Sequence, residues 1–246
     1  MSTPNFRFKQ FTVWHDKCAM KVGTDGVLLG AWCPVTGNPS PITRILDVGT
    51  GSGLVALMMA QRCPEAQIDA IDIDESAVEQ ARENFEQSAF RHQLSAYYSS
   101  LQDWSNHQSS ISDLQCYDLI VSNPPYFQNS LKNPDKGREL ARHTDSLPFG
   151  DLLAHSTMLL KEDGQFALIL PAEAEQEIRE LAERHGLHLT RVTRVYSKET
   201  KPARRVLMAF SRQPLTGTPI EDTLVLENEI GGRSAAYSEL CKEFYL

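Results

Sequence analysis

The chain has 246 residues, of which 41% are hydrophobic and 23% are charged, as is usual for one or two soluble globular domains. No apolar run approaches the length of a transmembrane helix and the N-terminus lacks the layout of a secretory signal, so we expect a cytoplasmic protein without membrane contact. The net charge of −8 argues against indiscriminate nucleic-acid binding, but it leaves room for a local basic patch.

Short apolar runs alternate with helical patterns from about residue 42 onward. In the first half of the chain, the pattern predicts strands over residues 42–48, 66–73, 94–99 and 117–122. A glycine turn over 49–53 opens a helix at 54–62, and Ser76 with Glu79 predicts a capping box for the helix 76–89. The Ser-rich stretch 99–113 predicts a loop.

In the second half, residues 149–160 predict a helix that residues 161–164 end, and residues 165–171 predict a strand. Residues 172–186 predict a helix with Gly186 as its C-cap. Residues 187–196 and 204–212 then predict an antiparallel hairpin, joined by the basic loop 197–203.

Strands that alternate with helices predict a parallel sheet covered on both faces. We therefore expect an α/β, doubly wound fold with a mostly parallel seven-stranded sheet and an antiparallel hairpin at one edge. Ligands of such folds bind beyond the carboxyl ends of the strands. We expect a single domain over 1–246, with an N-terminal extension (1–41), a core (42–212) and a C-terminal extension (213–246).

The turn after the first of these strands contains Gly49, Gly51 and Gly53, which allow a tight bend and close approach of a ligand. A loop that needs glycine only for its turn is the simplest alternative. A dinucleotide site is the more serious one, but its fingerprint is GxGxxG rather than GxGxG. With Asp47 two residues before Gly49, the loop resembles that of class I S-adenosylmethionine-dependent methyltransferases. The resemblance implies a Rossmann-like fold, S-adenosyl-L-methionine as cofactor, and Asp47 near the methionine end of the cofactor.

Later acids complete the expected cofactor site. Asp72 closes the second strand, where a carboxylate can accept hydrogen bonds from both ribose hydroxyls. We favour Asp72 over Asp74, which we interpret as a turn residue before the next helix. Asp103 follows the third strand, and the resemblance implies that it meets the adenine amino group of the cofactor.

Asn123, Pro124, Pro125 and Tyr126 follow a predicted strand, and neither proline can continue a sheet ladder. A proline-capped strand end with buried aromatic rings is the simple alternative. The four residues match the NPPY motif of amino-group methyltransferases. In the catalytic interpretation, the Asn123 side-chain oxygen and the Pro124 carbonyl accept the two N–H groups of an exocyclic amine and orient its lone pair. Tyr126 offers a face on which an extruded base can stack, and we expect Pro125 and Phe127 to contact the substrate.

Residues 21–32, KVGTDGVLLGAW, precede the first of these strands, where Thr24 and Asp25 predict either a turn over the cofactor or a capped amphipathic helix. Together with NPPYF and the later ARHTDSLPFGDLL, this segment resembles the bacterial tRNA1(Val) adenine N6-methyltransferases, which modify the adenine just 3′ of the anticodon. The resemblance spans nearly the whole chain. It implies that the protein methylates N6 of adenine 37 in the anticodon arm of a tRNA, with Thr24 and Asp25 at the cofactor.

NPPY alone does not fix the substrate, so ribosomal RNA, DNA adenine and a protein glutamine stay open as targets. A noncatalytic RNA-binding scaffold is a third hypothesis, from a different class of function.

Basic residues favour an RNA partner. Seven fall between residues 191 and 212 with only Glu199 opposing them, and more follow NPPYF. We expect RNA contacts from Arg142, Lys201, Arg204 and Arg205; the alternative is a solvated charged face.

The five cysteines include no CxxC pair, so we expect free thiols, no metal and a reducing compartment. We expect a monomer.

Overall fold

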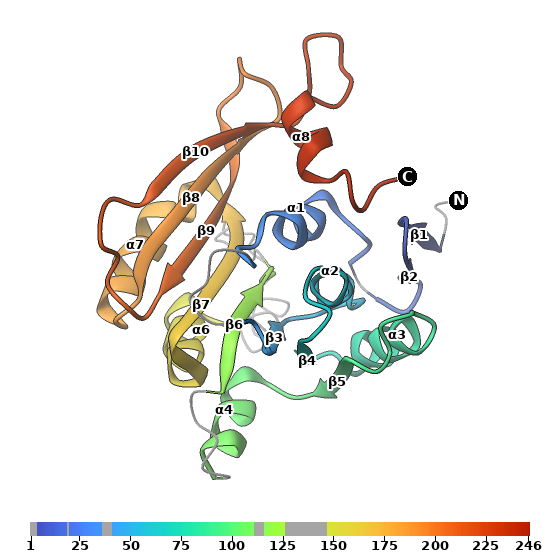
Figure 1. The fold of residues 1–246 in the computed structure, drawn as a ribbon, viewed down its shortest axis with the longest axis vertical. Coiled ribbons are helices and arrows are strands. Elements are labelled where there is room, and N and C mark those ends of the chain that lie inside the picture. Colours follow the sequence, from blue (N-terminus) through green and yellow to red (C-terminus); the bar gives the residue numbers. More distant parts are fainter. Residues whose placement is uncertain (1–3, 19, 36–40, 111–115, 126–146) are drawn as a thin grey trace, which may run out of the picture.

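A computed structural model of the chain describes residues 4–18, 20–35, 41–110, 116–125 and 147–246. Its centre is an eight-stranded sheet in the order β10-β8-β9-β7-β6-β3-β4-β5 (Figure 1). The strands are β3 (Arg44–Val48), β4 (Gln67–Asp72), β5 (Leu94–Tyr98), β6 (Tyr117–Ser122), β7 (Leu160–Pro171), β8 (His188–Tyr196), β9 (Ala203–Ser211) and β10 (Ile220–Val225).

Within this sheet β9 alone runs against its neighbours, because it pairs antiparallel with both β7 and β8. The other strand pairs are parallel. From β3 the chain proceeds to β4 and β5 on one side, and β6 then returns to the other side of β3. The strand order therefore reverses between β3 and β6, which is where open α/β sheets bind their ligands.

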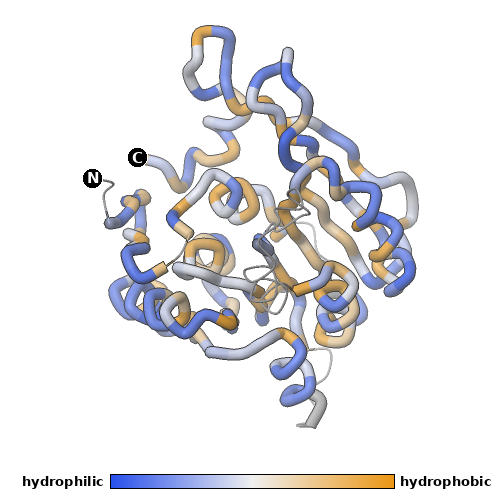
Figure 2. The backbone as a smooth tube through the Cα atoms, turned by 180° about the vertical axis from the view of Figure 1, so that it is seen from behind, coloured by the Kyte–Doolittle hydropathy of each residue, from blue (hydrophilic) through white to orange (hydrophobic). Residues whose placement is uncertain are grey.

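Helices cover both faces of the sheet, so the expected doubly wound α/β fold is confirmed (Figure 1). Ile45 and Leu46 are neighbours in β3, yet they lie in two separate hydrophobic cores, one on each face. One core includes residues of α1 (Thr24–Trp32), α2 (Leu54–Arg62) and α3 (Glu75–Glu86), and the other includes residues of α4 (Leu101–Ser110), α6 (Phe149–Leu159) and α7 (Glu175–Arg184). Figure 2 shows the hydrophobic residues gathered along the central strands between these layers.

The sheet has one more strand than the seven we expected. β10 pairs parallel with β8, so the β8–β9 hairpin is not at the edge of the sheet. Of the six residues of β10, only Leu224 is buried, and so the strand lacks the apolar run that marks the others.

Two local expectations were wrong, and one strand boundary differs. Residues 99–113 contain the helix α4, whose buried face includes the polar Ser105 and Gln108. Asp74, rather than Ser76, caps α3, because its side chain accepts a hydrogen bond from Ser76 N at 2.9 Å. The strand expected from Gln165 begins earlier, at Leu160, directly after α6 ends at Leu159. Gly186, by contrast, has a positive φ of 72° just after α7, as its predicted capping role requires.

The two ends of the chain lie side by side (Figure 1). A small sheet of β1 (Asn5–Arg7) and β2 (Thr12–Trp14) joins the first core together with α8 (Ala235–Leu240), and the short helix η1 (Ala172–Ala174) precedes α7. Lys9 N donates to Phe244 O at 2.9 Å, and the rings of Phe8 and Tyr245 are 6.1 Å apart. The limits of the two extensions at residues 41 and 213 stay a prediction. In the described part of the chain, no helix combines the length and the apolar character that a membrane span requires.

Candidate active site

A cavity of about 290 Å³ lies at the carboxyl ends of four neighbouring strands. Val48, Gly49 and Gly51 line it after β3, and Ile71 to Asp74 line it after β4. Ser99 to Gln102 contribute after β5, and Ser122 to Pro125 contribute after β6. The glycine loop and the Asn-Pro-Pro segment therefore border the same space.

The three loop glycines have different surroundings, although all have positive φ angles of 73°, 55° and 81° in chain order. A Cβ built at Gly49 or Gly51 would meet no other atom within 4 Å, and both residues line the cavity. They leave open backbone that a ligand can approach. A Cβ at Gly53 would lie 2.5 Å from Phe85 Cε1, so Gly53 serves the packing of α2 on α3 rather than the cavity.

Asp47 lies behind the loop and not in the cavity lining. Its side chain is buried, and its Oδ2 accepts hydrogen bonds from Thr50 Oγ1 at 2.7 Å and from Ala56 N at 3.1 Å. Burial raises the pKa of this carboxyl to about 7, and the two hydrogen bonds oppose the shift. Asp47 thus fixes the turn that joins β3 to α2.

Asp72 lines the cavity at the end of β4 and also holds the glycine loop. Its Oδ2 accepts a hydrogen bond from Gly51 N at 2.8 Å, and its Oδ1 accepts one from Asp74 N at 3.0 Å. Burial raises the pKa of Asp72, while the hydrogen bonds from Asp74 N and Gly51 N lower it. Asp74 lines the cavity too, in addition to capping α3.

Asp103 lies outside the cavity lining, because it belongs to the N-terminal cap of α4. Ser100 Oγ donates to Asp103 Oδ2 at 2.7 Å, and Asp103 N donates to Ser100 Oγ at 3.0 Å. Residues 99–102 line the cavity at this strand end instead. Their position directly after a strand is the feature of the sequence that could have identified them.

Asn123 follows β6 and is held next to the glycine loop. Val48 and Ser122 are paired in the sheet register, and Ser122 Oγ donates to Val48 O at 2.9 Å. Asn123 is half-buried, Pro124 is buried and Pro125 is exposed, and all three line the cavity. Tyr126, Phe127 and Arg142 lie outside the described residues.

Helix α1 packs against the Asn123 side chain. A Cβ built at Gly26 would lie 3.9 Å from Asn123 Nδ2 and 2.9 Å from Leu54 Cδ2. Within the segment 21–32, residues 24–32 form the helix α1. It is not the capped amphipathic helix of our second alternative, because no side chain caps it and residues 26–32 are all buried.

Thr24, Asp25, Arg204 and Arg205 line a second cleft, separate from the cavity. Arg205 Nε and Asp25 Oδ2 form an ion pair at 2.7 Å, which links β9 to the first turn of α1. Lys201 is exposed on the loop between β8 and β9 and forms no ion pair with any residue in the described ranges.

Most of the basic segment between residues 191 and 212 is neutralised by acids from distant parts of the chain. Arg194 pairs with Glu175 at 2.6 Å and with Glu221 at 3.1 Å. Arg191 pairs with Asp222 at 2.7 Å, and Lys198 pairs with Glu227 at 3.5 Å. Glu199 is the one acid within the segment, but acids outside it offset much of the positive charge that we expected to be available to RNA.

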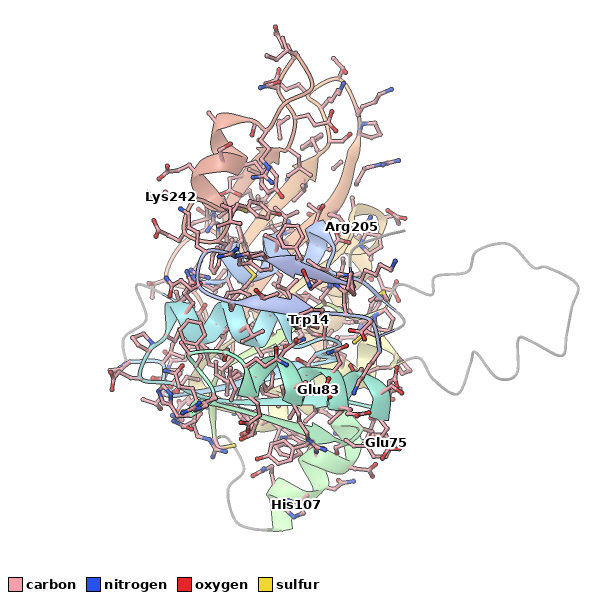
Figure 3. The ribbon with its side chains drawn as sticks, turned by 90° about the vertical axis from the view of Figure 1, so that its right-hand side faces the viewer. Trp14, Glu75, Glu83, His107, Arg205 and Lys242 are labelled. Carbon is pink, nitrogen blue, oxygen red and sulfur yellow. The ribbon has the colours of Figure 1, made fainter. Side chains whose placement is uncertain are left out.

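Cys18 and Met20 contribute to an N-terminal wall of the cavity, which no sequence motif indicated. Buried Asn84 of α3 holds this wall, because its Nδ2 donates to Trp14 O and to Ser52 O, both at 2.8 Å, and its Oδ1 accepts from Trp14 N at 2.9 Å. Figure 3 shows Trp14 beside α3, near Glu83. A buried asparagine in an amphipathic helix is the feature that could have identified this link.

The residues around the cavity fit an adenosyl cofactor. They offer open backbone at two glycines, a carboxylate at the end of β4, and apolar contacts from Ile71 and Leu101. Within the residues that the structure describes, no cluster of three or more metal-ligating side chains occurs.

Comparison with known proteins agrees with this geometry. Residues 36–186 match the family model of the methyltransferase small domain. A tRNA1(Val) (adenine(37)-N6)-methyltransferase of Parabacteroides distasonis is 47% identical and aligns over 100% of this chain and 99% of its own length. One from Erwinia tasmaniensis is 44% identical over 99% of this chain and 96% of its own.

Among solved structures, a predicted O-methyltransferase from Agrobacterium tumefaciens has the same fold. It covers 89% of this chain and 96% of its own, with a TM-score of 0.68 and 15% identity. The chain belongs to the methyltransferase small domain family and, within it, to the family of bacterial tRNA1(Val) (adenine(37)-N6)-methyltransferases.

Proposed function

We propose that the protein transfers a methyl group from S-adenosyl-L-methionine to N6 of an adenine in tRNA. One observation carries this proposal: Gly49, Gly51 and Asp72 line the same cavity as Asn123 and Pro124. A methyl donor at the glycine loop would therefore lie beside an amine held at the end of β6. The names of the full-length relatives support tRNA as the substrate.

Bound at this loop, S-adenosyl-L-methionine supplies an electrophilic methyl group on a sulfonium centre. We assign its nucleoside part to the loop glycines and to Asp72, whose carboxylate lies at the end of β4 and can accept hydrogen bonds from ribose hydroxyls. Residues 99–102 are placed to bound the cofactor on the β5 side. Cys18 and Met20 bound it on the N-terminal side.

We assign the orientation of the substrate amine to Asn123 and Pro124. The N6 lone pair of adenine is delocalised into the ring, so the nitrogen is a poor nucleophile while it stays planar. The Asn123 Oδ1 and the Pro124 carbonyl oxygen can each accept one N–H, which directs the lone pair out of the ring plane. Rate then comes from alignment and from dipoles fixed before the reaction. The proton can leave to solvent afterwards, so no strong general base is required.

The surroundings of Asn123 favour such alignment. The pairing of β6 with β3 and the hydrogen bond from Ser122 Oγ to Val48 O fix the end of β6. Helix α1 packs against the Asn123 side chain from the other side. Pro124 is buried, its ring restricts its φ, and the following Pro125 restricts its ψ, so the Pro124 carbonyl has little freedom. Tyr126 and Phe127 stay assigned to base stacking and substrate contact by the motif alone.

We further propose adenine 37 of tRNA1(Val) as the target, with the anticodon arm as the contacted region, on the strength of the relatives' names. Action as a monomer in the cytoplasm stays our expectation from the sequence.

The test uses purified protein, S-adenosyl-L-methionine and total nucleic acid from a strain that lacks the gene. Mass spectrometry of the nucleosides should find new N6-methyladenosine in the tRNA fraction. Methylation confined to ribosomal RNA or DNA would contradict the proposal, and so would the absence of any product at saturating cofactor.

A further inference from the structure

We propose that the second cleft, between α1 and the β8–β9 hairpin, binds a nucleobase next to the adenine that is methylated. This inference rests on the proposed function, and it concerns which RNA is chosen rather than how the methyl group moves. The cleft has a volume of about 630 Å³, within the range of roughly 300–1,000 Å³ that small-molecule sites occupy.

The lining of the cleft combines an apolar floor with a polar rim. Leu28 of α1 and Val195 of β8, both buried, close the floor of the cleft, and Leu226, which follows β10, is half-buried beside them. Asp25, Glu173, Arg204 and Arg205 provide charge. Aromatic bases bind against apolar surface through their faces and are identified by hydrogen bonds at their edges, so this combination suits a base.

The charges favour a base over a phosphate group. Two carboxylates, Asp25 and Glu173, balance two guanidinium groups, Arg204 and Arg205, so the lining has no net positive charge to attract a phosphate. Arg205 also forms an ion pair with Asp25 at 2.7 Å. Glu173 is exposed and has no hydrogen bond or ion pair with another described residue. Carboxylates repel phosphate but accept hydrogen bonds from the exocyclic amines of adenine, cytosine and guanine. Uracil has no such amine.

The cleft lies next to the cavity of the proposed active site. Asp25 lines the cleft, and the next residue, Gly26, faces Asn123, whose Nδ2 lies 3.9 Å from the position of a Cβ there. Consecutive Cα atoms are about 3.8 Å apart, so only the first turn of α1 separates the two sites. A nucleotide adjacent to the target adenine can therefore reach the cleft. Exposed Lys201, on the same hairpin, is suitably placed to contact the phosphate backbone.

The experiment measures kcat/KM for tRNA transcripts that keep the target adenine and vary the base on either side of it. At one of the two flanking positions, wild-type protein should prefer a base with an exocyclic amine to uracil by about tenfold. Glu173→Gln and Asp25→Asn keep the size of each side chain but remove an anionic acceptor. Together they should reduce the preference to about threefold or less, whereas the dissociation constant for S-adenosyl-L-methionine, measured by calorimetry, should not change.

Glu183→Gln is the matched control, because Glu183 is exposed near the far end of α7. This variant should keep the full wild-type preference. If wild-type protein methylates all transcripts equally, or if Asp25→Asn weakens cofactor binding while the base preference persists, the cleft is not a base subsite although the proposed function stands. If no transcript is methylated at all, the proposed function itself fails.

Discussion

Gly49, Gly51 and Gly53 show how one short motif combines two different requirements. The first two leave open backbone at the cavity, whereas the third lies against the Phe85 ring. The sequence could predict that all three adopt a tight turn, but it could not separate these roles, because Phe85 is remote from the loop in sequence.

This difference predicts opposite effects of alanine at two of these positions. Each substitution places a Cβ in the left-handed region, at a cost of about 1–2 kcal/mol. Gly53→Ala adds an overlap with Phe85 that costs about 1–3 kcal/mol more. It should therefore lower the free energy of unfolding in urea by more than Gly51→Ala does. Gly51→Ala should chiefly weaken cofactor binding in calorimetry. A larger loss of stability for Gly51→Ala than for Gly53→Ala would contradict these roles.

Asp47 predicts a pH dependence of stability. Its pKa rises from 3.8 to about 7 in the folded protein, so between these values the folded state binds more protons at this site than the unfolded state does. The contribution of Asp47 to the free energy of unfolding must then fall as pH rises from about 4 to 7. Asparagine does not titrate and can still accept both hydrogen bonds.

Asp47→Asn should therefore become progressively more stable relative to wild type between pH 5 and pH 7. The measurement is urea unfolding of both proteins at several pH values, because other titrating groups cancel in the difference between them. A constant difference across this range would show that the Asp47 carboxyl titrates normally.

The elements of the fold were predictable wherever hydrophobic residues follow one period. Apolar residues predicted strands β3 to β9, the helices between β3 and β7 predicted their parallel order, and the short loop after β8 predicted the antiparallel β8–β9 hairpin. The polar elements β10 and α4 escaped, and so did β1, β2 and α8 near the two ends of the chain. In α4 the buried Ser105 is matched by a 2.7 Å hydrogen bond to His155 Nδ1, a partner fifty residues away that no local pattern reveals.

Site residues could likewise be predicted only where a local sequence pattern marks them. Asp72 and Asn123 could be predicted because each follows a strand end, and the carboxyl ends of parallel strands meet at one edge of a sheet. Cys18 and Met20 could not be predicted, because long-range bonds to α3 place them at the cavity.

We therefore expect Asn84 of α3 to position the N-terminal wall of the cavity. Asn84→Ala removes bonds to both Trp14 and Ser52, which leaves buried backbone groups without partners. We expect a loss of about 2–4 kcal/mol in unfolding free energy and weaker binding of S-adenosyl-L-methionine in calorimetry. The exposed Gln87, at the C-cap of the same helix, is a control, and Gln87→Ala should change neither quantity. Unchanged cofactor affinity in folded Asn84→Ala protein would rule out the positioning role.

At the scale of the whole molecule, acidic residues of the C-terminal region reduce the positive charge of the basic segment between residues 191 and 212. Glu221, Asp222 and Glu227 pair with Arg194, Arg191 and Lys198. Sequence separation hides these pairs, so the prediction of an open basic patch overestimated the positive charge near the hairpin. Lys201 and Arg204 are exposed residues of that segment that form no ion pair with the described residues, so both are placed to attract RNA.

Two charge substitutions should separate structural from RNA-binding roles. Lys201→Ala should weaken tRNA binding and reduce the slope of the logarithm of the tRNA association constant against log[salt] by about one. The stability of the protein should not change. Arg194→Ala should leave tRNA affinity unchanged but destabilise the protein by up to about 1 kcal/mol, because Glu175 and Glu221 each lose one ion-pair partner and keep Arg179. Filter binding at several salt concentrations and thermal unfolding measure the two effects. A reversed pattern would place the RNA contact at Arg194.

The central claim is that Asn123 orients the substrate amine beside a cofactor held by the glycine loop. The most direct test compares wild type with Asn123→Ala in single-turnover methyl transfer to tRNA and in calorimetric binding of S-adenosyl-L-methionine. Because the cofactor is assigned to other strand ends, its dissociation constant should stay within about threefold, whereas the transfer rate should fall by about 100-fold or more. A transfer rate that survives the loss of the Asn123 side chain would contradict the mechanism.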